Sequence, residues 1–191
     1  MTAPLIDHIQ SYIPVSEGLR ARLSEIALPL VKEKSEFLHK PGNICKQTYF
    51  IVSGLVAISY EKGEKSITDN FAAEGEWVTS IYSFMRHAPD NFFIHVLEKS
   101  ELLAIDMEDL ERCFVDFPEM ERFGRLLISQ YFMEQSERII SMQFHSARER
   151  YDFYCATAKN KVHRVPLGML ASHLGMTQET LSRLRAERTA F

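Results

Sequence analysis

The sequence lacks long apolar runs and is poor in cysteine, and each lack excludes a class of protein. No stretch of the 191 residues approaches the roughly 20 apolar residues that a membrane-spanning helix needs. The three cysteines, Cys45, Cys113 and Cys155, are widely spaced with no CxxC pair, so we expect buried reduced thiols and no disulfide framework. The first residues lack a basic leader and an apolar run, and we therefore expect a cytoplasmic protein.

Histidines in a metal-binding pattern are also missing. The central part of the chain holds only His39, His87 and His95, without an HxH motif. A cupin-type metalloenzyme needs a cluster of histidines with a carboxylate, and the spacing of the histidines identifies no haem ligand. We therefore predict no metal, no haem and no catalytic residue, and we expect a protein that is not an enzyme.

The net charge of −4 is distributed unevenly along the chain. Residues 145–191 carry eight Lys and Arg against four Asp and Glu, whereas residues 1–144 carry 14 against 22. An acidic body with a basic tail fits a chain whose C-terminal part binds nucleic acid. The asymmetry alone is weak evidence, because solvated helices are often basic by chance.

Residues 34–106 have the pattern of antiparallel β-structure. Turn signals such as Pro41-Gly42 and Ser53-Gly54 separate short apolar or alternating runs. Short strands at regular spacing, with turns between them, indicate a barrel or jelly roll. The predicted strands are Tyr49–Val52, Leu55–Tyr60, Ser66–Phe71, Phe92–Val96 and Leu102–Ile105. Before this segment, leucines and isoleucines at intervals of three and four predict helix within residues 1–30.

A long helix is predicted from Pro118, which suits a first helical turn, to Phe144. Its apolar side chains fit either packing on the chain's own β-structure or a dimer interface, and spacing does not decide between the two. The candidate interface residues are Phe123, Leu127 and Tyr131. We divide the chain into a β-roll domain with flanking helices (1–116), this central helix (117–144) and a C-terminal unit (145–191).

Residues 167–185 have the pattern of a helix-turn-helix. Gly175 can adopt the positive φ that ends the first helix, and Thr177 is placed to cap the second. Ala171 is small where the two helices would cross, while Leu181 and Leu184 fall on the inner side of the second helix. The combined pattern favours a DNA-reading module over simple two-helix packing.

The outer side of the second helix carries side chains that can read bases or bind phosphate. Arginine pairs with guanine, glutamine with adenine, and short hydroxyls suit phosphate. The predicted DNA-binding residues are Thr177, Gln178, Glu179, Thr180, Ser182, Arg183 and Arg185. Taken singly, Glu179 and Arg183 also fit a surface ion pair, since they are four residues apart.

With these motifs, the chain resembles the cyclic-AMP receptor protein/Fnr (Crp/Fnr) family of transcriptional regulators over nearly its whole length. Tyr49–Val56 resembles the early β-roll motif of the family, and Gly75-Glu76-Trp77 resembles a later turn. Leu170–Arg183 is the most specific match. The resemblance implies an α+β fold: an antiparallel β-roll or jelly roll of the cyclic-nucleotide-binding type, a long dimerisation helix and a winged helix-turn-helix.

The resemblance also implies a homodimer that binds double-stranded DNA at symmetric half-sites about 34 Å apart. The family's base-reading positions fall on Gln178, Glu179 and Arg183, and Gln178 replaces the arginine of the best-known members. A wing would have to come from residues before Leu167, with Val162–Val165 as one strand. RNA polymerase is a further partner to consider.

The sensor end departs from the family. Cyclic-nucleotide sites there place an Arg-Ser or Arg-Thr pair about ten residues after a Gly-Glu turn, and no such pair follows Gly75-Glu76 here. We therefore do not expect a cyclic nucleotide, and three scattered cysteines cannot supply the four ligands of an iron–sulfur cluster. The candidate residues for an unidentified small effector are Trp77, Ser80, Tyr82 and Arg86. The alternative function is a small-molecule-binding barrel whose C-terminal module no longer binds DNA.

Overall fold

The structure is a computed structural model that describes residues 2–62 and 65–189. The helices are α1 (Ala3–Gln10), α2 (Glu17–Ile26), α3 (Ile81–Arg86), α4 (Met107–Asp116), α5 (Pro118–Phe144), α6 (Ala147–Thr157), α7 (Leu167–His173) and α8 (Gln178–Thr189). The strands are β1 (Leu28–Lys32), β2 (Phe37–His39), β3 (Gln47–Ser53), β4 (Val56–Lys62), β5 (Lys65–Ala72), β6 (Trp77–Val78), β7 (Phe92–Val96) and β8 (Ser100–Asp106). The predicted order of helix, β-structure, long helix and helical C-terminal unit is confirmed.

The strands form two antiparallel four-stranded sheets, in the orders β1-β8-β3-β6 and β2-β7-β4-β5. Side chains from both sheets, such as Ile51 and Val96, pack into one apolar cluster. The predicted helix over residues 1–30 is wrong in its last part, because α2 ends at Ile26 and β1 follows. Pro29 is tolerated in β1 because that strand lies at the edge of its sheet.

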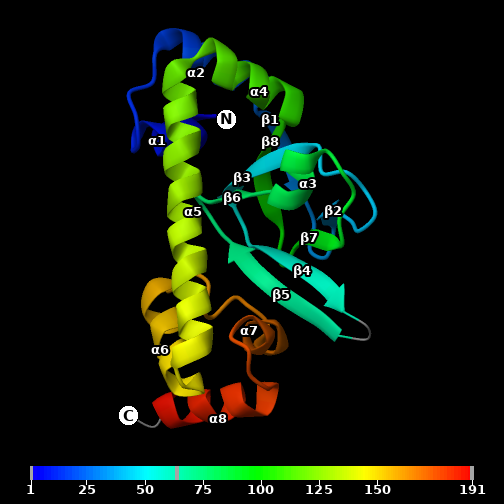
Figure 1. The fold of residues 1–191 in the computed structure, drawn as a ribbon, viewed down its shortest axis with the longest axis vertical. Coiled ribbons are helices and arrows are strands. Elements are labelled where there is room, and N and C mark those ends of the chain that lie inside the picture. Colours follow the sequence, from blue (N-terminus) through cyan, green and yellow to red (C-terminus); the bar gives the residue numbers. More distant parts are fainter. Residues whose placement is uncertain (1, 63–64, 190–191) are drawn as a thin grey trace.

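Helix α5 connects the two ends of the molecule (Figure 1). Its N-terminal half shares a core with α1, α2 and α4, which includes Leu5, Leu19 and Phe123. Beside its C-terminal half lie α6, α7 and α8. These helices share a second core with the β4–β5 hairpin, where Phe71 packs in the same cluster as Leu170. The C-terminal unit is therefore packed directly on the β-structure.

The segment between α6 and α7 differs from the predicted wing. Val162–Val165 does not form a strand, because hydrogen bonds from Val162 N to Ala158 O and from Val165 N to Lys161 O close it into turns. The two valines are buried in the core of the C-terminal unit, which explains why their alternation resembled a strand.

Cys45, Cys113 and Cys155 are all free and buried, as predicted. Across residues 2–62 and 65–189, no helix has the length and apolar character needed to cross a membrane.

Candidate functional site

Helices α7 and α8 form the predicted helix-turn-helix. Gly175 adopts a φ of +63°, and its N–H donates to Ser172 O at 3.1 Å, which ends α7. The positive φ favours glycine here, and a Cβ would also lie 2.4 Å from Cε of Met142, so that the flexible end of this side chain would have to move. Thr177 caps α8, since its Oγ1 accepts from Thr180 N at 3.2 Å.

The two sides of α8 separate as the sequence predicted. Leu181 and Leu184 are buried against Ala171 and the rest of the C-terminal core. The side chains of Thr177, Gln178, Glu179, Ser182 and Arg183 are exposed, and Thr180 is half-buried. Helix α8 lies at the end of the molecule, away from the β-sheets (Figure 1). The predicted reading face is therefore accessible to a large partner.

Glu179 and Arg183 are both exposed, and within the described part of the chain no ion pair joins them. The pKa of Glu179 lies below its ordinary value because its own backbone N–H and the Thr177 hydroxyl donate to the carboxylate. Glu179 thus supports the start of α8, and Arg183 is the cation of this face that projects into solvent.

Arg185 lies differently from Arg183. It is half-buried, and its Nη2 donates to Val162 O at 3.0 Å. This bond ties α8 to the turns between α6 and α7, which occupy the place where a wing was expected. Arg185 therefore has a packing role that its position in the sequence did not reveal.

The three residues predicted for a dimer interface all contact other parts of the same chain. Phe123 is 1% exposed, and Leu127 is partly buried against the same core. The Tyr131 hydroxyl donates to Trp77 O at 3.1 Å and accepts from Trp77 N at 3.2 Å. Phe123 is therefore a core residue, whereas Leu127 and Tyr131 are half-buried, and the dimer interface stays a prediction.

Helix α5 also carries exposed apolar side chains, which are distributed over more than one of its sides. Phe132 is 71% exposed and Phe144 is 77% exposed. The set is Ile128, Phe132, Met133, Ile139, Ile140, Met142 and Phe144. Ile128, Phe132 and Ile139 follow one another at intervals of four and seven, which places them on one line along the helix. This spacing was present in the sequence, but two apolar stripes could not be ranked without knowing which one packs on the sheets.

The predicted effector residues do not converge on one pocket. Trp77 packs in the aromatic core with Phe50 and Phe123. Tyr82 and Arg86 are exposed on α3, where the guanidinium lies over the tyrosine ring at 4.8 Å and donates to its hydroxyl at 3.2 Å. Ser80 is buried as well, and its hydroxyl bonds to Asp90 rather than to any of the other three candidates.

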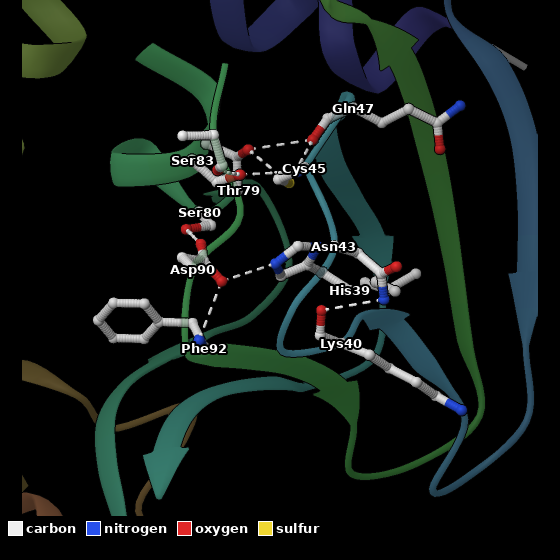
Figure 2. Close-up of polar contacts among 12 residues, drawn as sticks. His39, Lys40, Asn43, Cys45, Gln47, Thr79, Ser80, Ser83, Asp90 and Phe92 are labelled. Atoms are coloured by element: carbon white, nitrogen blue, oxygen red, sulfur yellow. Dashed lines mark hydrogen bonds and ion pairs between the residues drawn. The ribbon is translucent and has the colours of Figure 1, made fainter. Parts of the chain in front are cut away.

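Ser80 belongs to a buried hydrogen-bond network that the sequence did not reveal (Figure 2). Its hydroxyl donates to Asp90, and the other oxygen of that carboxylate lies 2.9 Å from His39 Nε2 and accepts from Phe92 N at 3.0 Å. Burial alone raises the pKa of Asp90, but these hydrogen bonds outweigh it and hold the pKa below its ordinary value. The network joins β2, the start of α3 and β7.

A second group of bonds closes the same region from the other side (Figure 2). Ser83 Oγ accepts from Cys45 N at 2.8 Å and donates to Ala88 O at 2.6 Å. Thr79 Oγ1 donates to Gln47 O at 3.0 Å. Thr79, Ser80 and Ser83 of this segment therefore bond to the protein's own backbone and side chains.

The β-structure and the C-terminal unit meet through ion pairs. Arg164 binds Glu74 at 2.8 Å and also pairs with Glu98. Lys161 binds Glu76 at 2.8 Å. The Arg164 guanidinium is the main cause that lowers the pKa of Glu74 to about 2.

The buried His173 of α7 adds a hydrogen bond at this junction, with Nδ1 2.8 Å from Asp69 O. A cavity of about 340 Å³ lies beside these contacts, between β5, α5 and α6.

Comparison with known protein families gives a match in the β-structure. Residues 30–116 match the cyclic nucleotide-binding domain family. This match covers β1–β8 and α4, which is the part that the sequence predicted as a β-roll. No curated protein sequence matches the chain significantly.

Solved structures of bacterial proteins share the fold over most of the chain. The c-di-GMP-responsive global regulator CLP of Xanthomonas campestris is 17% identical, with 92% of each chain covered and a TM-score of 0.72. FixK2 of Bradyrhizobium japonicum is 14% identical, with 86% of this chain and 85% of that chain covered and a TM-score of 0.75.

A third structure is a putative transcriptional regulator of the Crp/Fnr family from Eubacterium rectale. It is 16% identical, with 94% of this chain and 88% of that chain covered and a TM-score of 0.71. The resemblance seen in the sequence is thus confirmed at the level of the fold. Residues 30–116 match the cyclic nucleotide-binding domain family, and the chain shares its fold with solved structures of bacterial regulators, one of them described as a Crp/Fnr-family protein.

Proposed function

We propose that this protein is a sequence-specific, DNA-binding transcriptional regulator that acts as a homodimer. The observation that carries the proposal is the exposed polar face of α8, with Gln178, Glu179, Ser182 and Arg183 turned to solvent. Side chains of these types can bond to base edges in the major groove, which admits a helix. Thr177 and Thr180 lie at the start of α8, where hydroxyls suit phosphate contacts.

The dimer is supported by the exposed apolar line on α5. Ile128, Phe132 and Ile139 lie on a side of the helix that does not pack on the sheets. When a second copy of the same helix packs against this line around a two-fold axis, the apolar side chains of both copies are removed from water. Two copies of α8 would then face two half-sites about one turn of DNA apart.

The shared fold gives the proposal its context. CLP is described as a global regulator, and the Eubacterium rectale protein as a putative transcriptional regulator. We extend that role to this chain because its α8 keeps an accessible reading face. Control by a small effector and contact with RNA polymerase stay predictions from the resemblance, and the four effector candidates support no common pocket.

The test is selection of bound fragments from random duplexes with the purified protein, together with its mass in solution. We expect a dimer and a motif with two-fold symmetry. Binding should weaken steeply as salt rises, because contacts with phosphates release counterions. A dimer that enriches no motif and does not retain duplex at low salt would instead support the alternative, a small-molecule-binding barrel without DNA binding.

A further inference from the structure

Two arginines outside the helix-turn-helix bind three successive carbonyl groups at its turn. Arg150 of α6 donates from Nε to Leu174 O at 2.8 Å and from Nη2 to Gly175 O at 3.4 Å. Arg138 of α5 donates from Nη2 to His173 O at 3.4 Å. The last carbonyls of a helix have no partner within it and carry partial negative charge, so cations stabilise them.

Arg150 also reaches the joint between the long helix and the C-terminal unit. Its Nη1 donates to His145 O at 2.7 Å, and His145 is the residue that ends α5. Only His145 and Ser146 separate α5 from α6, and a capping box of Ser146 and Glu149 starts α6. One guanidinium therefore binds the end of α5 and the turn before α8 at once.

The same turn touches α5 directly. Gly175 lies so close to Met142 that an added Cβ would be 2.4 Å from its Cε. The turn is thus held on one side by a side chain of α5 and on the other by a guanidinium of α6. A planar guanidinium with five donors can bond to several carbonyls in fixed directions, whereas a lysine presents a single ammonium group.

We propose that Arg150, assisted by Arg138, is a positioning residue that fixes the orientation of α8 relative to α5. This inference rests on the proposed function, because the orientation matters when α5 pairs with a second copy and two α8 helices must meet one DNA duplex. Arg150 is half-buried and bonds only to backbone carbonyls among the contacts described, so its role is geometry and not phosphate binding.

The test compares wild type, Arg150→Met and Arg150→Lys on duplexes that carry the selected half-sites. The spacer between the half-sites is the selected length, one base pair shorter or one longer, since one base pair turns the duplex by about a tenth of a turn. Wild type should prefer the selected spacer strongly. Arg150→Met should bind that spacer roughly tenfold more weakly, as expected when hydrogen bonds from a charged group are lost, and should discriminate little among the three. Arg150→Lys should lie between them.

Two controls separate positioning from other effects. Lys159→Met removes an exposed cation from the same unit and should keep the spacer preference. The salt dependence of Arg150→Met should equal that of wild type, because losing a phosphate contact would lower the slope by about one. Thermal unfolding checks that each variant folds, and Arg150→Lys replaces Arg150→Met in every comparison if the latter does not.

Amide hydrogen exchange in the DNA-free protein tests, independently of any operator, whether Arg150 holds the turn before α8 in place. We expect faster exchange across residues 173–180 in Arg150→Met than in wild type and Lys159→Met. Unchanged exchange, or an unchanged spacer preference in a folded Arg150 variant, would overturn the inference. Failure of wild type to select any motif would count against the proposed function. Faster exchange in Arg150→Met would in that case still support the role of Arg150 in holding the turn before α8.

Discussion

The polar side chains of α8 and those of the β6–α3–β7 segment differ in what they bond to. On α8, Gln178, Ser182 and Arg183 face solvent on one side of a single helix. In the β6–α3–β7 segment, Ser80 is buried and bonded to Asp90, which also lies against His39. The first arrangement leaves donors and acceptors free for a partner, whereas the second uses them to hold the protein together.

The difference shows which kind of site can be predicted from a sequence. A reading face on one helix depends on local periodicity, and α8 shows the predicted sides. An effector pocket depends on side chains from separate strands and loops converging. The predicted set of Trp77, Ser80, Tyr82 and Arg86 lies in the stretch that corresponds to the family's pocket, and here the first two are buried and the last two are exposed.

The largest expected effect concerns the buried hydrogen-bond network around Asp90. Asp90→Ala leaves Ser80, His39 and Phe92 N without their buried acceptor, so the free energy of unfolding should fall by about 3 kcal/mol or more. Urea unfolding followed by fluorescence of Trp77, the single tryptophan, measures it.

Asp109→Ala is the matched control. It removes a partly exposed carboxylate that binds Arg22 at 2.7 Å, and a surface pair of this kind contributes about 1 kcal/mol or less. Equal losses in the two variants would show that the buried network contributes no more than a surface ion pair.

The next effect concerns the exposed apolar line of Ile128, Phe132 and Ile139 on α5. Phe132→Glu places a charge at the centre of the proposed dimer seam and removes a side chain whose burial is worth roughly 2–3 kcal/mol. The variant should be monomeric at concentrations where wild type is a dimer, as sedimentation would measure. Glu137→Lys changes the charge on another side of α5 and should leave the dimer intact. A dimeric Phe132→Glu would remove this line from the interface.

The third effect sharpens the contrast within α8. Arg183→Ala should weaken operator binding by about 1–3 kcal/mol and relax the preference at one base pair per half-site. Arg185→Ala should instead reduce thermal stability, because Arg185 bonds to Val162 O, and should keep the base preference. Binding to all single-base variants of the operator checks both. A base preference lost in Arg185→Ala and kept in Arg183→Ala would reverse the two assignments.

The smallest effect near neutral pH concerns the junction of the two ends. Burial lowers the pKa of His173 to about 4, so the folded protein keeps this histidine neutral where an unfolded chain, with its ordinary value of 6.5, would protonate it. The resulting stability is complete above pH 6.5 and is lost as the pH falls from 6.5 to 4.

Unfolding measured across this pH range should show the decline in wild type, and His173→Gln should flatten it. His163→Gln, which changes an exposed histidine of the same unit, should retain the pH dependence of wild type. A decline of the same steepness in His173→Gln would assign it to other groups.

Much of the architecture followed from local signals. The long helix has the predicted bounds, Pro118–Phe144, because a proline at its first turn and a continuous periodicity define it. The strands β3, β4, β5, β7 and β8 were found from alternation and turn residues. The short strands β1, β2 and β6 were not predicted, since runs of two to five residues carry too little pattern to be distinguished from loops or helix ends.

The outcome for α5 shows what periodicity leaves open. Leu127 and Ile128 are neighbours in the chain, yet one packs on the core and the other is exposed. Both lie on apolar stripes with helical spacing, and the sheets decide which stripe they cover. For this reason the proposed dimer seam uses the exposed stripe, whereas the helix itself has the predicted bounds.

The helix-turn-helix at residues 167–185 was determined by the sequence itself, because a glycine with positive φ, a capping threonine and a two-sided helix are all local requirements. Tertiary structure alone decided what surrounds it. Arg150 bonds to carbonyls 24 and 25 positions along the chain, and Arg164 to carboxylates 90 and 66 positions away. Long-range bonds of this kind leave no periodic trace in a sequence, since their partners meet only when the chain has folded.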